Sequence, residues 1–223
     1  MNVVVFDLDD TLFPEEQFVM SGFRAVDTWL EQNLQVRGFL PVSKQIFHEG
    51  DRKSVFNIAL QQLDVDFDDA LITTLVSVYR EHFPQIELFE DALWAITYAR
   101  QYTRTAIITD GYLVMQRNKV NALELTDRFD LIVYSDVFGR EGWKPSPLPY
   151  QEVMNSLGCV GENCLYIGDN PTKDFITARK LGWKTVRVAR ENGIYSHVQP
   201  DAEHEADQVI SDLRQLEYII SKD

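Results

Sequence analysis

The chain has 223 residues, which is enough for one large domain or for a core domain that carries a smaller insertion. Its formal net charge of −14 at pH 7 disfavours non-specific binding to nucleic acid and to anionic membrane surfaces, so we expect neither as a partner. No stretch approaches the ~20 consecutive apolar residues that a membrane-spanning helix needs, and 45% hydrophobic residues is ordinary for a soluble globular protein.

The first predicted element is a buried strand at residues 3–6. This run of four apolar residues is followed by Asp7, Asp9 and Asp10, so the strand brings carboxylates to its C-terminal end. No basic residue precedes the run and the acids follow at once, which is unlike a secretory signal. We therefore predict a cytoplasmic protein, in which the chain's two cysteines are reduced thiols.

Residues 15–83 carry helical periodicity, with apolar side chains at three- and four-residue spacing. Roughly seventy residues of helix are too many for a simple crossover between two strands. We therefore predict a helical domain at 15–84, inserted into a core domain that is formed by 1–14 and 85–223. Ligands of open parallel sheets bind at the C-terminal edge of the strands, so we expect the insertion to cover that edge as a lid.

The rest of the chain alternates between short β-branched or aromatic runs and helical patterns. The predicted strands are 105–109, 131–134, 165–167, 185–188 and 208–210. The clearest predicted helices are 112–123, 148–157 and 171–181, the last opening with proline and closing on glycine. This alternation predicts an α/β fold with a parallel sheet that helices cover on both faces.

Asp7 and Asp9 form the first of four clusters that carry chemistry. They project toward the same side of the strand end, because side chains alternate along a strand. Two carboxylates this close cannot both stay ionised cheaply unless a cation neutralises one. That suits a nucleophile held as carboxylate by a metal, beside a second acid that donates and accepts protons. The alternative, a turn rich in N-capping residues, explains Asp10 and Thr11 well but Asp7 poorly.

Two further clusters lie at or near strand ends. Thr109, Asp110 and Gly111 close a predicted strand, where a phosphate would meet the threonine hydroxyl and the N–H groups of the turn. Lys144 precedes two prolines that restrict the local backbone, so its charge could neutralise a phosphate or an acyl-phosphate. Taken singly, these residues are more commonly a plain strand-to-turn transition and a rigid loop with a surface lysine.

The fourth cluster contains Asp169, which follows another predicted strand, and Asp174, at the start of the next helix. Asp169 would supply a hard oxygen ligand and Asp174 would orient metal-bound water. Alternatively, Asp174 only stabilises the helix N-terminus. Because the C-terminal ends of parallel strands face one crevice, all four clusters would converge where a phosphate dianion and Mg²⁺ could bind.

In this order, and across nearly the whole chain, these residues resemble the four motifs of the haloacid dehalogenase-like superfamily. The motifs are matched by Asp7 with Asp9, by Thr109, by Lys144, and by Asp169 with Asp174. The helical insertion resembles the cap domain found between the first and second motifs of that family. The resemblance implies a Rossmann-like, three-layer core with a parallel sheet and a small all-helical cap domain.

The resemblance also implies a hydrolase that acts on phosphoric monoesters in two steps. Asp7 would attack phosphorus and become an aspartyl-phosphate, and Asp9 would protonate the leaving alcohol and then activate water. Thr109 and Lys144 would hold the transferring group. The dehalogenases of the family lack the second acid, so Asp9 disfavours dehalogenation.

The resemblance further implies Mg²⁺ as the cofactor. Its predicted ligands are the side chains of Asp7 and Asp169 and the backbone carbonyl of Asp9, with Asp174 as a further acidic member of the site. The predicted substrate-binding residues are Asp10, Thr109, Asp110, Gly111 and Lys144.

Three other functions fit part of this pattern. A phosphomutase would use the same four clusters and return the phosphoryl group to a sugar. A phospho-acceptor switch also uses aspartates and a lysine at a sheet edge, but it carries no helical insertion after its first strand. A purely structural relative is disfavoured, because no motif position has been lost.

The substrate is predicted only as a class: a small phosphorylated metabolite such as a nucleoside monophosphate, a sugar phosphate or phosphoglycolate. The insertion holds cations that could bind a second anionic group and aromatic residues that could stack on a base, although surface charge and core packing explain both sets. These residues are Arg24, Arg37, Lys44, His48, Arg52 and Lys53, and Phe18, Phe47 and Phe56. Either a monomer or a homodimer is expected.

Overall fold

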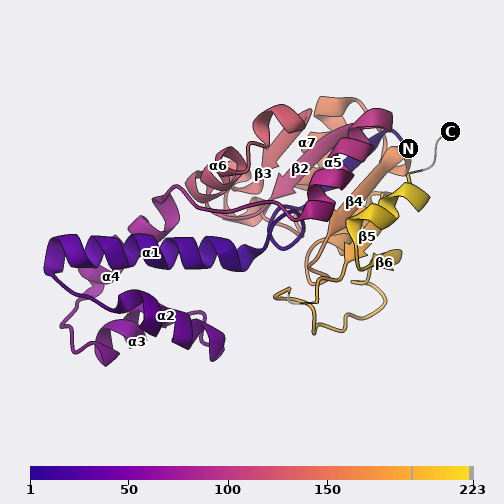
Figure 1. The fold of residues 1–223 in the computed structure, drawn as a ribbon. Helices are drawn as coiled ribbons and strands as arrows, with labels where there is room; N and C mark the ends of the chain where they lie inside the picture. Colours follow the sequence, from indigo (N-terminus) through magenta and orange to yellow (C-terminus); the bar gives the residue numbers. More distant parts are fainter. Residues whose placement is uncertain (192, 221–223) are drawn as a thin grey trace. The chain divides into compact units, whose positions relative to one another are not determined.

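The structure is a computed structural model that describes residues 1–191 and 193–220 (Figure 1). The chain divides into two compact units. One, the core unit, contains Met1–Glu15 and Glu87–Asp223, and the other, the helical unit, is Glu16–Ile86. No helix in the described ranges is both long enough and apolar enough to cross a lipid bilayer.

The core unit contains a six-stranded sheet in which every neighbouring pair is parallel. Its strands are β1 (Val3–Phe6), β2 (Arg104–Thr109), β3 (Leu131–Tyr134), β4 (Cys164–Gly168), β5 (Lys184–Val188) and β6 (Gln208–Ile210). The spatial order is β3-β2-β1-β4-β5-β6, and Figure 1 labels all of these strands except β1. The order reverses direction between β1 and β4, and this switch point is where open α/β sheets bind their ligands.

Helices pack on the sheet as the sequence predicts. They are α5 (Glu90–Tyr102), α6 (Leu113–Ala122), α7 (Leu148–Leu157) and α8 (Phe175–Lys180). Side chains of α7 and α8 share one apolar cluster with alternate residues of β1, β2 and β4, so these two helices cover one face. The predicted α/β fold with a Rossmann-like parallel sheet is confirmed.

One predicted helix begins later than expected. The proline-to-glycine pattern predicts a helix from residue 171, but α8 starts only at Phe175. The reason is Asn170, whose side-chain oxygen accepts hydrogen bonds from the Thr172 N–H, at 3.0 Å, and from the Thr172 hydroxyl, at 2.7 Å. This local turn competes with helical hydrogen bonding and uses the first residues of the predicted helix.

The helical unit consists of most of α1 (Glu15–Leu34), with α2 (Phe39–His48), α3 (Val55–Gln62) and α4 (Asp69–Glu81). Its core is apolar and rich in aromatic rings. The ring of Phe23 contacts those of Phe39, Phe47, Phe56 and Tyr79 at centroid distances of 5.9 to 6.4 Å. These packed rings hold the short helices together.

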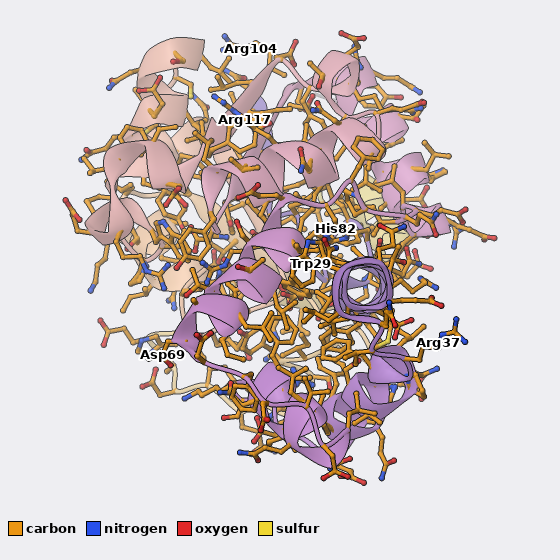
Figure 2. All side chains as sticks on the ribbon, turned by 90° about the vertical axis from the view of Figure 1, so that its left-hand side faces the viewer. Trp29, Arg37, Asp69, His82, Arg104 and Arg117 are labelled. Atoms are coloured by element: carbon orange, nitrogen blue, oxygen red, sulfur yellow. The ribbon has the colours of Figure 1, made fainter. Side chains whose placement is uncertain are left out.

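Two further features of the helical unit follow from this packing. Gly22 lies where a Cβ atom would be 2.4 Å from the Tyr79 ring, so only glycine allows α1 and α4 to approach this closely. The charged side chains named above, from Arg24 to Lys53, are all exposed. Among them, Arg37 points away from the helices (Figure 2).

Candidate active site

Three of the predicted site residues stand at the C-terminal ends of adjacent strands. Asp7 follows β1, Thr109 closes β2, and Asp169 follows β4. Because β1 lies between β2 and β4, these side chains meet at one edge of the sheet. The Asp7 N–H continues the ladder by donating to the Ile167 carbonyl at 2.8 Å, which fixes the backbone that presents the carboxylate.

Lys144 lies in the middle of this edge and is buried. Its Nζ donates to Asp7 Oδ1 at 2.5 Å, to Asp174 Oδ1 at 2.7 Å and to the Tyr166 hydroxyl at 2.8 Å. Burial alone would lower the pKa of this ammonium, but the carboxylates of Asp174 and Asp7 outweigh it and raise the pKa well above its usual range. Lys144 is therefore a fixed cation between two carboxylates.

Asp174 is oriented by its neighbours and does not cap the helix that follows it. It occupies the residue before α8, yet its side chain makes no capping hydrogen bond there. Its Oδ2 accepts from the Asn170 N–H at 3.0 Å, while Oδ1 accepts from Lys144. A Cβ atom on Gly168 would lie 2.5 Å from Asp174 Oδ2, so glycine at the end of β4 makes room for this carboxylate.

Asp7, Asp169 and Asp174 form a set of oxygen donors that suits a hard divalent cation. Each offers one carboxylate oxygen, these oxygens lie within 4.8 Å of one another, and all three residues are buried. Burial, and then the charge of neighbouring aspartates, raises the pKa of Asp169 well above its usual range. Burial likewise raises the pKa of Asp7 from 3.8 to about 7, although Lys144 opposes the shift. A cation bound here would remove this repulsion, so these residues fit Mg²⁺.

Asp9 is held by two side chains of α6 that sequence reasoning missed. Lys119 Nζ donates to Asp9 Oδ1 at 2.6 Å, and Gln116 Nε2 donates to Asp9 Oδ2 at 2.8 Å. Gln116 Nε2 also donates to Thr109 Oγ1 at 2.5 Å. One feature of the sequence could have indicated these residues. They are polar, lie three positions apart, and belong to the predicted helix that directly follows the Thr109 motif.

Asp110 connects several residues of the site through hydrogen bonds. Its Oδ1 accepts from the Ser135 hydroxyl at 2.6 Å and from the Lys144 N–H at 3.1 Å, and its Oδ2 accepts from Lys173 Nζ at 3.0 Å. Burial alone would raise its pKa, but the charges of Lys144 and Lys173 hold the pKa below its usual value. Asp110 thus links the second motif to Lys144, and Lys173 is a further site residue that sequence reasoning missed.

The remaining two predicted substrate-binding residues have structural partners. Asp10 has a φ of 51°, and its carboxylate accepts from the N–H groups of Glu15, at 2.8 Å, and Ile194, at 2.9 Å. Gly111 has a φ of 136°, and a Cβ atom there would lie 2.9 Å from the Gln116 side chain. Both residues shape the backbone around the site, and their contact with substrate stays a prediction.

A pocket with an empty volume of about 390 Å³, including solvent at its mouth, opens at this edge. It is lined by Asp7, Asp9, Glu15, Asp110, Asp169, Asn170, Lys173 and Tyr195. Five of these eight side chains are carboxylates and one is a lysine, so a phosphate dianion would be repelled without an added cation. Lys144 and Thr109 are buried and are not part of this lining.

The sequence of this chain matches a known protein family. A family model described as haloacid dehalogenase-like hydrolase matches residues 4–188 of this chain. The chain belongs to the haloacid dehalogenase-like hydrolases. The match includes every motif residue on which the predicted family and the predicted enzyme class rest, and both predictions are confirmed.

The chain is also similar to individual phosphatases. The glyceraldehyde 3-phosphate phosphatase of Methanopyrus kandleri is 27% identical over 209 residues, covering 90% of this chain and 88% of that protein. The phosphoglycolate phosphatase of Aquifex aeolicus is 27% identical over 195 residues, with 83% of each chain covered. The crystal structure of a HAD phosphatase from Thermococcus onnurineus has a TM-score of 0.66 at 22% identity, covering 100% of this chain and 99% of that one. That structure therefore shares the fold.

Proposed function

We propose that this hydrolase is a magnesium-dependent phosphatase that cleaves a small phosphomonoester through an aspartyl-phosphate on Asp7. The observation that carries the proposal is the pairing of two aspartates with separate cations. Asp7 contacts Lys144 at 2.5 Å, and Asp9 contacts Lys119 at 2.6 Å. One carboxylate is thus held for attack, and the other is held apart from it for proton transfer.

In the first step, the Asp7 carboxylate attacks phosphorus and the bond to the leaving alcohol breaks. Asp9 gives its proton to the departing oxygen, which would otherwise leave as a poor alkoxide. The charge of Lys144 would neutralise part of the charge on the transferring phosphoryl group, and the Thr109 hydroxyl would donate to one of its oxygens. In phosphoryl transfer, positioning and charge neutralisation supply most of the catalysis.

In the second step, Asp9 takes a proton from a water molecule that attacks the phosphorus of the intermediate. The bond between phosphorus and Asp7 breaks, which frees inorganic phosphate and restores both aspartates. Mg²⁺ would be held by the carboxylates of Asp7 and Asp169, with Asp174 close by and the Asp9 carbonyl as a predicted further ligand. The ion would neutralise phosphate charge in a pocket that is otherwise acidic.

For the substrate we propose a small phosphorylated metabolite. Support comes from the relatives named above, which are a glyceraldehyde 3-phosphate phosphatase and a phosphoglycolate phosphatase. The helical unit would act as a cap domain that selects among such esters. Its exposed cations, including Arg24 and Arg52, are the side chains there suited to bind a second anionic group.

The test is phosphate release from glyceraldehyde 3-phosphate, phosphoglycolate, glycerol 3-phosphate, ribose 5-phosphate, AMP and p-nitrophenyl phosphate. Each ester is assayed with Mg²⁺, with EDTA, and with the Asp7→Asn variant. An exposed residue, Asp66, provides the matched control Asp66→Asn. We expect repeated turnover that needs both Mg²⁺ and Asp7. A folded protein that takes up phosphate once without releasing it, or that releases none, would overturn the proposal.

A further inference from the structure

Helix α6 buries two polar side chains where a helix packed on a sheet normally buries apolar ones. Gln116 is 0% exposed and Lys119 is 1% exposed. Burying an ammonium group is costly unless a counter-charge and hydrogen bonds compensate for the lost water. Two such residues, three positions apart on one helix face, therefore indicate a role that apolar side chains could not fill.

The contacts of these two side chains converge on the groups proposed for proton transfer and phosphate binding. Lys119 and Gln116 each take one oxygen of the Asp9 carboxylate, at 2.6 and 2.8 Å. Because both oxygens are engaged, rotation of the carboxylate would break at least one contact. The Lys119 ammonium also lies 5.9 Å from the centre of the buried Phe13 ring, which packs against this lysine.

Gln116 also links Asp9 to Thr109. Its Nε2 carries two hydrogens, and these point to Asp9 Oδ2 and to Thr109 Oγ1, the latter at 2.5 Å. Within the part of the chain that the structure describes, its Oε1 is buried and has no hydrogen-bond partner. A threonine hydroxyl that accepts from Gln116 has its own proton left to donate, which is what binding a phosphoryl oxygen requires.

We propose that Gln116 and Lys119 are positioning residues, which together hold the Asp9 carboxylate and the Thr109 hydroxyl in the geometry that proton transfer and phosphoryl binding need. This inference rests on the proposed function. Neither side chain is consumed, because the proton passes from Asp9 to the leaving oxygen in the first step and returns to Asp9 from water in the second.

The inference makes a prediction that depends on the leaving group. An alkyl phosphate needs a proton on its departing oxygen, whereas p-nitrophenolate leaves well without one. The value of kcat/KM reports the steps up to departure of the alcohol, so it isolates the step in which Asp9 acts as an acid. A residue that positions Asp9 is therefore needed more for alkyl esters than for the aryl ester.

The experiment measures kcat/KM of Lys119→Met and Gln116→Leu for the best alkyl ester of the panel and for p-nitrophenyl phosphate. General acid catalysis contributes ~10²–10⁴-fold, so for Lys119→Met we expect a loss of ~10–100-fold with the alkyl ester and a much smaller loss with the aryl ester. Gln116→Leu also releases Thr109, so it should lose activity with both esters, and more with the alkyl ester. Lys119→Arg keeps a cation and should recover part of the alkyl activity. Lys180, which is exposed on α8, provides the control Lys180→Met, with no expected change for either ester.

Circular dichroism and thermal unfolding establish which variants are folded. If Lys119→Met does not fold, Gln116→Leu and Lys119→Arg carry the same comparison. Equal losses for both esters in folded variants would show a structural role only and would overturn the inference. Failure of the unsubstituted enzyme to hydrolyse any ester would instead refute the proposed function, so the two failures are distinguishable.

Discussion

The two units of this protein bury very different side chains. Among the described residues of the helical unit, the buried polar side chains are Ser21 and Ser43, and the remainder of its interior is aliphatic or aromatic. The core unit buries Asp7, Lys144 and Asp174 in contact with one another, and further charged groups nearby. Hydrophobic packing accounts for the first interior, whereas the second contains costly charges that packing alone would not select.

This contrast supports the proposed location of the catalytic groups in the core unit. Burial raises the pKa of Asp7 and Asp169, the carboxylates of Asp174 and Asp7 raise the pKa of Lys144, and the three groups meet at the edge where the strands end. Perturbed groups of this kind concentrate at functional sites. The helical unit has no comparable cluster among its described residues, so its proposed contribution is shape and surface charge. The following predictions test this division.

The largest effect is expected for Lys144→Met. Removing one partner of a buried ion pair costs ~3–5 kcal/mol, because Asp7 and Asp174 would then be buried without their cation. Removing the cation that we propose to neutralise the phosphoryl group should also lower kcat by ~10²–10³-fold. Urea unfolding and phosphate release measure the two effects. The control is Lys44→Met, at an exposed lysine of the helical unit. A folded Lys144→Met enzyme with full activity would contradict the proposed role of buried charge in the core unit.

A comparable loss of stability without loss of chemistry is expected for Phe23→Ala. The Phe23 ring is 3% exposed and contacts four other rings, so its removal leaves a cavity that costs ~3–5 kcal/mol. It is not among the residues that line the pocket. Below its melting temperature, the variant should therefore hydrolyse p-nitrophenyl phosphate with kcat close to that of the unsubstituted enzyme. Abolished turnover in the folded variant would contradict this division between the units.

A smaller effect is expected from Mg²⁺ on thermal stability. A ligand at one hundred times its Kd stabilises the folded state by about 2.7 kcal/mol, which for a chain of this size raises Tm by ~5–10 °C. Asp169→Asn removes a proposed ligand and should lose most of this gain at the same Mg²⁺ concentration. Differential scanning fluorimetry with Mg²⁺ and with EDTA measures it. An equal gain in both proteins would exclude Asp169 as a ligand.

The last prediction concerns how the stability of the metal-free protein depends on pH. The pKa of Asp7 rises from 3.8 in a free side chain to about 7 in the fold, mainly through burial, so between these values the folded state holds a proton that the unfolded chain has lost. Stability is then greatest below this window and falls by about 1.4 kcal/mol per pH unit as pH rises through it. Urea unfolding in EDTA from pH 4 to 7 should show a fall of at least this size, and Asp7→Asn should make the slope shallower. A slope unchanged by the substitution would show that Asp7 is not its source.

Most of the strands could be predicted from the sequence, because each is a short apolar run bounded by turn residues. The runs at 131–134 and 208–210 match β3 and β6 residue for residue. The helix predicted from residue 171 was wrong at its start, because the Asn170 side chain forms a local turn that a proline-to-glycine pattern does not reveal. The cysteines are free thiols, as predicted, with Sγ atoms 3.4 Å apart.

The candidate site was predicted only in part. The motif residues follow apolar strands, and that local pattern indicates a strand end wherever it occurs. Gln116 and Lys119 belong to a helix, where a polar residue normally faces water, so their spacing after the second motif did not by itself indicate burial. Lys173 was missed because its partner Asp110 lies 63 positions away along the chain.

The sequence by itself determined the order of strands and helices, the family, and the residues that stand at the strand ends, because these depend on local periodicity and on short motifs. Only the tertiary structure decided which charges face one another. It set Lys144 between Asp7 and Asp174, and Lys119 against Asp9, over separations of 30 to 137 residues. Coulombic and hydrogen-bond energies depend on distances of a few ångströms, and such distances between remote residues exist only once the sheet has brought its strand ends together.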